Sequence, residues 1–125
     1  MKNVALITGN KVLSQGLEAA LRARGDLEMQ LLPPLGYRKA QVGVEAYGAQ
    51  VAVIDAIERS DESEVLALCR SLRSTAAGCK ILLLVSADTL QARDFAVRAK
   101  QQGLADDFVF YDSSLTYLFA KLSAF

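Results

Sequence analysis

The sequence has 125 residues, of which 52% are hydrophobic, and its 14 basic and 14 acidic side chains give a formal net charge of zero. The length predicts a single domain over residues 1–125 with a full hydrophobic core. No apolar run approaches the ~18 residues that indicate a membrane-spanning helix. Lys and Arg form no cluster in the sequence, which disfavours direct binding to nucleic acid.

Two residue types narrow the chemistry further. The sequence has no histidine, which excludes His-based triads and removes the most common general base and transition-metal ligand. Its two cysteines, Cys69 and Cys79, lack the spacing of a zinc site. Because the N-terminus also lacks the features of a secretory signal, we expect a cytoplasmic protein with two reduced thiols.

The first predicted unit is a strand over residues 4–8 that is followed at once by a helix. Three leucines, each four residues after the last, fall on one face of this helix. Asn10 is a suitable N-cap, and Gly25 is expected to end the helix.

Four further strand–helix units follow. Ser113 or Ser114 is expected to cap the last helix. The predicted strands cover residues 27–32, 51–54, 80–85 and 108–111, and the predicted helices cover 38–47, 62–73, 90–102 and a last segment from about 115.

This alternation predicts an α/β fold, a doubly wound five-stranded parallel sheet with helices on both faces. In such a sheet, ligands gather outside the carboxyl ends of the strands. The residues expected there are Thr8, Gly9, Asn10, Asp55, Ala56, Ser86, Ala87, Tyr111 and Asp112.

A nucleotide site at the first turn is one functional alternative. A dinucleotide-binding turn has the pattern G-x-G-x-x-G, but Gly9 and Gly16 are separated by six residues, and no third glycine is in register. The phosphate-binding P-loop pattern is also absent. Small-ligand or nucleotide binding in the strand-end crevice, with Gly9 and Asn10 as its floor, remains an alternative.

The residues at the predicted strand ends favour another class. Asp55 closes the third strand after "QVAVI", Ser86 and Ala87 close the fourth, and "ADDFVFYD" forms the fifth strand and its exit. Over essentially the whole chain this resembles the receiver domain of bacterial two-component response regulators. The resemblance is greatest to the LuxR/nitrate-regulator type, for which "NKVLSQGLEAAL" is a typical first helix, and it implies the flavodoxin-like receiver fold.

The resemblance also implies a phosphorelay chemistry. In this family, an Asp on the third strand receives a phosphoryl group from a histidine kinase or a small donor. A Mg²⁺ ion, held by that Asp, an acidic pair after the first strand and a backbone carbonyl, neutralises the transferring group. A Ser or Thr after the fourth strand and a Lys after the fifth hold the phosphate, and an aromatic residue on the fifth strand switches the output face.

By this resemblance, Asp55 falls at the phosphoacceptor position and Phe108 at the switch position. Ser86 is the expected hydroxyl residue, although Val85 is an alternative because the fourth strand looks one residue long. Ala87 is the small neighbour of the phosphate site. Each residue also has a structural interpretation: Asp55 as a cap on the following loop, Ser86 as a helix-entry hydroxyl and Phe108 as part of the core.

The sequence departs from the family pattern where the chemistry is most demanding. Thr8 and Gly9 replace the acidic pair, and Tyr111 replaces the phosphate-binding Lys. Asp112 and Arg59 replace two prolines. Mg²⁺ usually relies on carboxylates, so we expect no metal site, or at most weak Mg²⁺ binding at Asp55, and no cofactor.

We therefore expect a pseudo-receiver, not an enzyme, that acts without phosphorylation as a dimerisation or docking module in bacterial transcription regulation. The partner, or a second copy, is expected at the last helices, where some of Tyr117, Phe119 and Phe125 are expected to be exposed. A DNA-binding output domain is expected to follow in a longer regulator. An active phosphoacceptor at Asp55 with an unusual metal site is the remaining alternative, and Asp106 and Asp107 are expected to be solvated.

Overall fold

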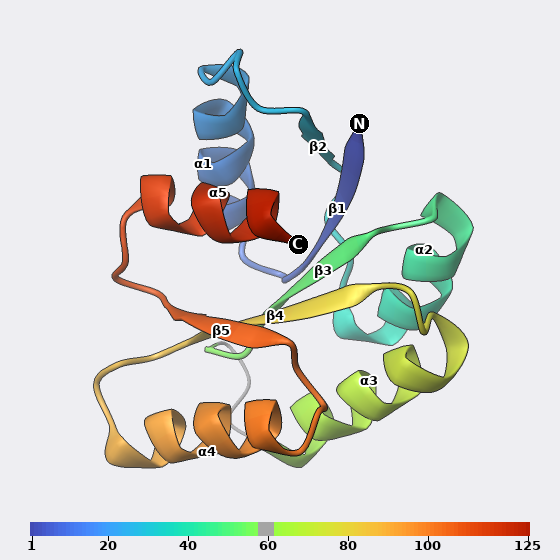
Figure 1. Ribbon diagram of the computed structural model, residues 1–125, viewed down its shortest axis with the longest axis vertical. Helices are drawn as coiled ribbons and strands as arrows, with labels where there is room; N and C mark the ends of the chain where they lie inside the picture. The colour runs from blue at the N-terminus through green and yellow to red at the C-terminus, as the bar shows by residue number, and fades with distance from the viewer. Residues whose placement is uncertain (58–61) are drawn as a thin grey trace.

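A computed structural model describes residues 1–57 and 62–125 and confirms the predicted fold class. Five parallel strands form one sheet, and helices cover both of its faces (Figure 1). The strands are β1 (Lys2–Ile7), β2 (Met29–Leu31), β3 (Val51–Asp55), β4 (Lys80–Val85) and β5 (Asp107–Phe110), and the helices are α1 (Lys11–Arg22), the 3₁₀ helix η1 (Tyr37–Lys39), α2 (Ala40–Tyr47), α3 (Glu62–Thr75), α4 (Leu90–Gln101) and α5 (Leu115–Ala124).

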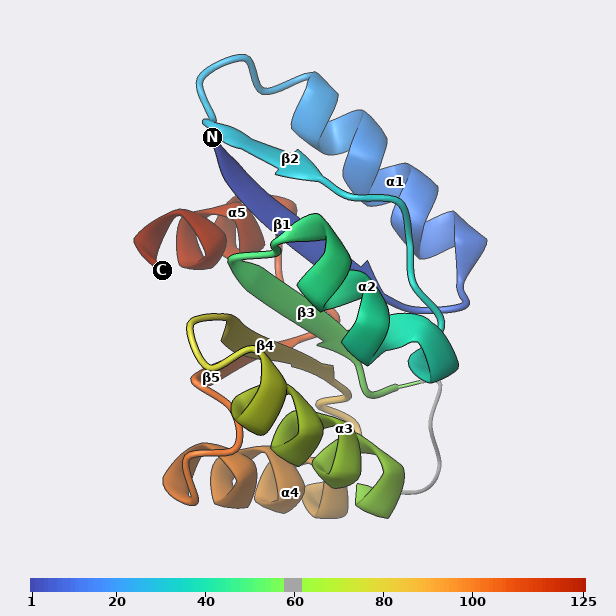
Figure 2. The ribbon, with the colours of Figure 1, turned by 90° about the vertical axis from the view of Figure 1, so that its right-hand side faces the viewer.

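The strand order is β2-β1-β3-β4-β5. The chain moves outward from β1 to β2 and then crosses back to β3 on the other side of β1, as Figure 2 shows. The pairing register sets Ile7 beside Ile54 and Asp55 beside Leu84. The point at which the strand order reverses therefore lies between the ends of β1 and β3, the usual position of a ligand crevice in open α/β sheets.

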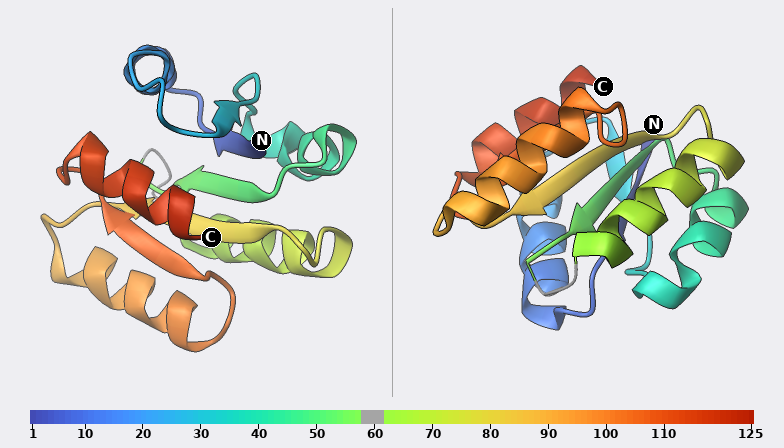
Figure 3. Two further views of the ribbon diagram at one scale, coloured as in Figure 1. Left: turned by 45° about the horizontal axis from the view of Figure 1, so that its top comes forward. Right: turned by 90° about the horizontal axis from the view of Figure 1, so that it is seen from below.

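Two hydrophobic layers hold the helices to the sheet. One layer joins α1 and α5 to one face through Leu17, Leu118 and Phe119, and the other joins α2, α3 and α4 to the opposite face. Figure 3 shows the sheet between these two groups of helices. Every residue of β3 is buried, as expected for a central parallel strand with both faces covered.

Most predicted helix ends are confirmed. Asn10 and Ser114 cap α1 and α5 through their side chains, and Gly48 and Gly103 adopt positive φ just after α2 and α4. The prediction that Gly25 ends α1 is wrong. The helix ends at Arg22 with a right-handed cap residue, so no left-handed glycine is needed there.

Three predicted boundaries also move. The predicted helix over 38–47 divides into η1 and α2. The second strand is shorter than the predicted 27–32, because β1 begins at Lys2 opposite Met29, which leaves the residues before Met29 without a strand to pair with. Strand β5 ends at Phe110, opposite the last residue of β4, so Tyr111 lies just beyond it.

Both cysteines are free and buried, as predicted. Burial raises the pKa of the Cys69 and Cys79 thiols to about 11, which leaves them protonated and unreactive near neutral pH. No helix in the described ranges is long and apolar enough to cross a membrane.

Candidate functional site

The carboxylate of Asp55 lies at the end of β3, and only 1% of the residue is exposed. Its Oδ2 accepts a hydrogen bond of 2.7 Å from the hydroxyl of Thr8, and its Oδ1 accepts one of 3.0 Å from the backbone N–H of Ile57. Both donors are uncharged. In the part of the chain that the structure describes, no Lys or Arg forms a salt bridge with Asp55.

Thr8 follows β1 directly and is 96% buried, with a 4% exposed fraction. Its hydroxyl oxygen also accepts a hydrogen bond of 3.0 Å from the backbone N–H of Asn10. The side chain of Asn10 in turn accepts hydrogen bonds from the N–H groups of Val12 and Leu13 and so caps α1. A continuous series of hydrogen bonds therefore runs from Asp55 to the start of α1.

The segment after β2 covers this site. Leu35 pairs with Ile7 in an isolated bridge, and its carbonyl accepts a hydrogen bond from the N–H of Thr8. Two residues later, the hydroxyl of Tyr37 donates a 3.3 Å hydrogen bond to the backbone carbonyl of Asp55. The sequence analysis missed Tyr37, because no local pattern indicates that η1 lies over the end of β3.

Ser86 and Ala87 follow β4 and are half-buried. The Oγ of Ser86 accepts a hydrogen bond of 3.1 Å from the N–H of Asp88. This is the bond expected of a hydroxyl that orders the turn leading into α4. The alternative residue, Val85, is buried and ends β4. Ser86 is thus the first hydroxyl residue beyond the strand.

Tyr111 follows β5 and is 45% exposed, and its N–H donates to the carbonyl of Val85. Asp112 and Gly9 are also exposed. Phe108 is half-buried, packs against the core and forms an edge-to-face contact with Phe110, with 5.7 Å between ring centroids. Phe108 thus packs against the core from the edge of the buried cluster.

Three basic side chains from α3, α4 and α5 contact the start of β5, at the opposite end of the strand from Tyr111. Asp107, at the start of the strand, accepts hydrogen bonds from Lys121 at 2.6 Å and from Lys100 at 3.3 Å. Asp106 pairs with Arg73 at 2.8 Å and accepts a bond from the N–H of Ile81. The prediction that Asp106 and Asp107 are solvated is therefore wrong, because α3, α4 and α5 bring cations to both.

The residues around Asp55 do not fit a Mg²⁺ ion. Within residues 1–57 and 62–125, no three acidic or cysteine side chains come close enough to hold a metal. Thr8 and Gly9 supply no carboxylate, and both oxygens of Asp55 already accept hydrogen bonds. Arg59, which replaces a family proline, lies outside the described residues.

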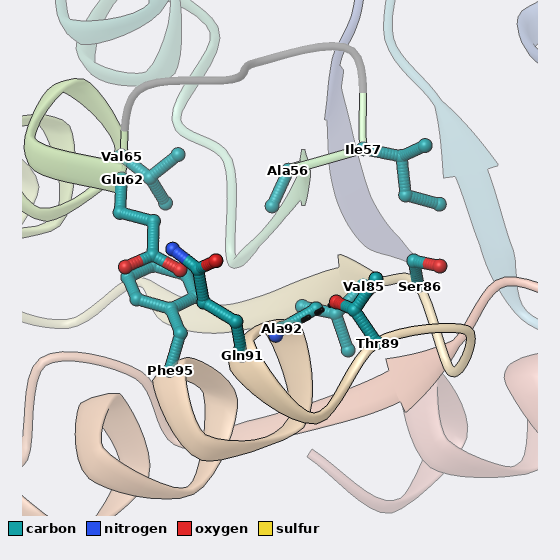
Figure 4. A pocket seen from close by; sticks show the side chains of 10 residues that line it. All are labelled: Ala56, Ile57, Glu62, Val65, Val85, Ser86, Thr89, Gln91, Ala92 and Phe95. Atoms are coloured by element: carbon teal, nitrogen blue, oxygen red, sulfur yellow. Dashed lines mark hydrogen bonds between the residues drawn. The ribbon is translucent and has the colours of Figure 1, made fainter.

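A cavity of about 190 Å³ opens beside this site, between the ends of β3 and β4 and the helices α3 and α4. Figure 4 shows Glu62, Gln91 and Phe95 toward one end of it and Ile57 and Ser86 toward the other. Gly9 and Asn10 are not among its lining residues. The cavity thus lies one strand away from the reversal point between β1 and β3, where Thr8 and Asp55 bond to each other.

The last helix presents a mixed surface. Tyr117 is 48% exposed, which confirms the expectation that some of the three aromatic residues are exposed. Phe125 is half-buried, and Phe119 is only 3% exposed. It lies on the same helical face as Leu118 and Leu122, which pack on the sheet beside α1.

No protein-family model matches the sequence, and no curated protein matches it. Solved structures do match. A LuxR-family DNA-binding response regulator from Staphylococcus aureus is 16% identical with a TM-score of 0.75, over 99% of this chain and 98% of that one. An adenylate cyclase from Rhodopirellula baltica is 16% identical with a TM-score of 0.79, over 98% and 85% of the two chains.

A CheY-like protein from Pseudomonas aeruginosa is 19% identical with a TM-score of 0.73, over 98% of this chain and 97% of that one. The receiver domain of a Francisella response regulator is 15% identical with a TM-score of 0.76, over 99% and 95% of the two chains. The fold that the resemblance implied is thereby confirmed, and the chain has the receiver-domain fold of CheY-like proteins and response regulators.

Proposed function

We propose that this chain is a pseudo-receiver: a cytoplasmic, single-domain signalling module of a bacterial regulator that acts without phosphorylation, bound cofactor or enzymatic activity. One observation carries the proposal. Only 1% of Asp55 is exposed, and both oxygens of its carboxylate accept hydrogen bonds from uncharged donors.

Phosphoryl transfer to a carboxylate has three requirements that the described residues around Asp55 do not meet. The attacking oxygen must reach the phosphorus, a divalent cation must bridge donor and acceptor, and positive charge must stabilise the transferred group. A phosphate adds about −1.5 to −2 charges at pH 7. The neutral hydroxyl of Tyr111 supplies no charge to offset it.

The direct test is phosphoryl labelling of the whole chain. Incubated with Mg²⁺ and acetyl phosphate, the wild-type protein is expected to keep its intact mass. A variant with Thr8→Asp, Gly9→Asp and Tyr111→Lys restores the acids and the lysine of the family and is expected to gain one phosphoryl group. Adding Asp55→Asn to that variant is expected to abolish the gain. Stoichiometric labelling of Asp55 in the wild-type protein would contradict the proposal.

The signal would then be carried by a surface. Large apolar side chains near the last helix are exposed: Tyr111 and Leu115 at 45% and Tyr117 at 48%. Exposed apolar groups of this size are frequent in protein interfaces. We infer that this surface binds a protein partner or a second copy, in a regulator whose separate output domain binds DNA.

The homodimer version is testable by sedimentation. Tyr117→Glu on α5 is expected to shift the protein toward monomer. Tyr47→Glu on α2 is a matched control, because Tyr47 is also 48% exposed but belongs to a helix on the opposite face of the sheet. A wild-type protein that is monomeric at every concentration would rule out the homodimer and leave a different protein as the partner.

The cavity between the ends of β3 and β4 favours a second candidate, binding of a small ligand. At about 190 Å³ it is smaller than the roughly 300–1,000 Å³ of most ligand pockets. A thermal-shift screen with nucleotides and dinucleotides is therefore expected to show no change. A rise of several degrees with one of them would favour the ligand-binding function over the docking function.

A further inference from the structure

We propose that Thr8 is the positioning residue of the strand-end site: its hydroxyl holds Asp55 inward and ties the turn after β3 to the start of α1. The proposal deepens the proposed function, because it assigns a cause to the inaccessibility of Asp55. It rests on a hydrogen bond of 2.7 Å between the side chains of two residues that are 4% and 1% exposed.

The chemistry of a hydroxyl suits this position. A threonine hydroxyl can donate one hydrogen bond and accept others at the same oxygen. In this structure the Thr8 hydroxyl accepts a hydrogen bond from the N–H of Asn10 and donates one to Asp55, so it acts as both acceptor and donor. A carboxylate at position 8 could accept from the N–H of Asn10 but could not donate to Asp55.

Charge leads to the same conclusion. Two carboxylates in contact inside a protein repel each other unless a cation lies between them. One carboxylate with a hydroxyl donor and an N–H donor has no such requirement. The pair formed by Thr8 and Asp55 therefore needs no cation between its two side chains.

The series of hydrogen bonds also joins two parts of the molecule. The N–H of Ile57, in the turn after β3, donates to one oxygen of Asp55, and Thr8 donates to the other. Through Thr8 the series continues to Asn10, whose side chain caps α1. Loss of the Thr8 hydroxyl is thus expected to loosen the turn after β3 and the first turn of α1 together.

The test compares Thr8→Val, which removes only the hydroxyl, with Thr8→Ser, which keeps it. Thr89→Val is the matched control, because the hydroxyl of Thr89 accepts the N–H of Ala92 to cap α4, whereas Asp55 accepts its hydrogen bonds from Thr8 and Ile57. The readouts are modification of Asp55 by a water-soluble carbodiimide with an amine nucleophile, mapped by mass spectrometry, and amide hydrogen exchange. Neither readout uses a phosphoryl donor or a metal. The proposal about Thr8 can therefore fail while the proposed function holds, and the proposed function can fail while the proposal about Thr8 holds.

In Thr8→Val, Asp55 is expected to react about tenfold faster than in the wild-type protein, the effect of losing one buried hydrogen bond. The amides of Ile57 and Asn10 are expected to exchange faster, while that of Val53 in the core of β3 stays protected. Thr8→Ser and Thr89→Val are expected to leave Asp55 at the wild-type rate. Equal rates in Thr8→Val and wild type, or a loss of protection at Val53 that accompanies the faster reaction, would overturn the proposal.

A wild-type measurement covers the case in which Thr8→Val does not fold. A buried, hydrogen-bonded hydroxyl proton exchanges slowly enough with water to be seen by NMR. We expect a separate resonance for the Thr8 hydroxyl, with a cross-peak to the amide of Asn10. Its absence, together with Asp55 reacting as fast as the exposed Asp88 in the wild-type protein, would overturn the proposal.

Discussion

Two aspartates at opposite ends of the sheet are held in contrasting ways. Asp55, after β3, is buried and accepts hydrogen bonds from the hydroxyl of Thr8 and one backbone N–H. Asp107, at the start of β5, accepts hydrogen bonds from Lys121 at 2.6 Å and Lys100 at 3.3 Å and one from the N–H of Phe108. The first carboxylate has neutral partners, and the second has two cations.

The difference lies in which carboxylate has cationic partners. The resemblance to receiver domains implies a lysine just after β5, and Tyr111 occupies that position. Lys100 and Lys121 instead join α4 and α5 to the start of β5. A strand-end carboxylate is thus compatible with two roles, one chemical and one structural, and its hydrogen-bond donors distinguish them.

The largest expected effect separates the two aspartates by stability. Asp55→Ala should lower the free energy of unfolding by about 2–4 kcal/mol, because it leaves the buried hydroxyl of Thr8 and the partly buried N–H of Ile57 without their acceptor. Asp107→Ala should cost about 0.5–1 kcal/mol, since its ion pairs are partly exposed. Urea denaturation of both variants checks this, with Asp88→Ala on the exposed surface as the control. Equal losses would mean that the comparison is wrong.

Next in size is a change in the segment that covers Thr8. A Cβ added to Gly43 in α2 would lie 2.6 Å from the side chain of Leu35, whose carbonyl accepts the N–H of Thr8. Gly43→Ala should therefore cost about 1–3 kcal/mol of stability, because the side chain of Leu35 must move. Gly16→Ala is the control, since nothing lies within 4 Å of its added Cβ, and it should stabilise α1 by about 0.5–1 kcal/mol. A neutral Gly43→Ala would show that this segment adapts freely.

The ion pairs of Asp107 should depend on pH. Burial alone would raise its pKa, but hydrogen bonds from Lys121, the N–H of Phe108 and Lys100 outweigh burial and hold the pKa below its ordinary value of 3.8. Because the folded-state pKa is depressed, this stabilisation is present above pH 3.8 and is lost as the pH falls through the folded-state pKa.

At alkaline pH, the stability contributed by Lys121 changes in the opposite direction. The hydrogen bond to Asp107 raises the pKa of Lys121 above 10.5, so its contribution is complete below that pH and is lost as the pH rises through the raised pKa. Asp107→Asn should flatten both limbs of a plot of melting temperature against pH. High salt should weaken this cluster and leave the bond between Thr8 and Asp55 unchanged. An unaltered pH profile in Asp107→Asn would contradict the assignment.

The smallest expected effect concerns Tyr37. Its hydroxyl donates to the backbone carbonyl of Asp55 at 3.3 Å, a long hydrogen bond. Tyr37→Phe should lower the free energy of unfolding by about 0.5–1 kcal/mol, the usual net contribution of one such bond. Chemical denaturation with Tyr47→Phe as the control measures it, because Tyr47 is exposed. A loss as large as that of Asp55→Ala would show that Tyr37, and not Thr8, is the main support of the site.

The sequence predicted the fold well, because its evidence was local. Continuous apolar runs specify buried strands, periodic leucines specify helical faces, and Asn10 specifies a helix start. The errors arose where an outcome depended on a distant neighbour. Asp107 was expected to be solvated, but cations from α4 and α5 reach it. The sequence also left open which of Tyr117, Phe119 and Phe125 are exposed, and the structure packs Phe119 on the sheet beside α1.

The sequence by itself determined that the chain forms a parallel α/β sheet, that Asp55 ends its third strand, and that no acidic pair or lysine accompanies it. Only the tertiary structure decided that Thr8 is the partner of Asp55 and that Tyr37 lies over it. Thr8 and Asp55 are 47 residues apart in the chain. Such contacts follow from strand order and register, which the packing of all the elements sets together, whereas local patterns act over only a few residues.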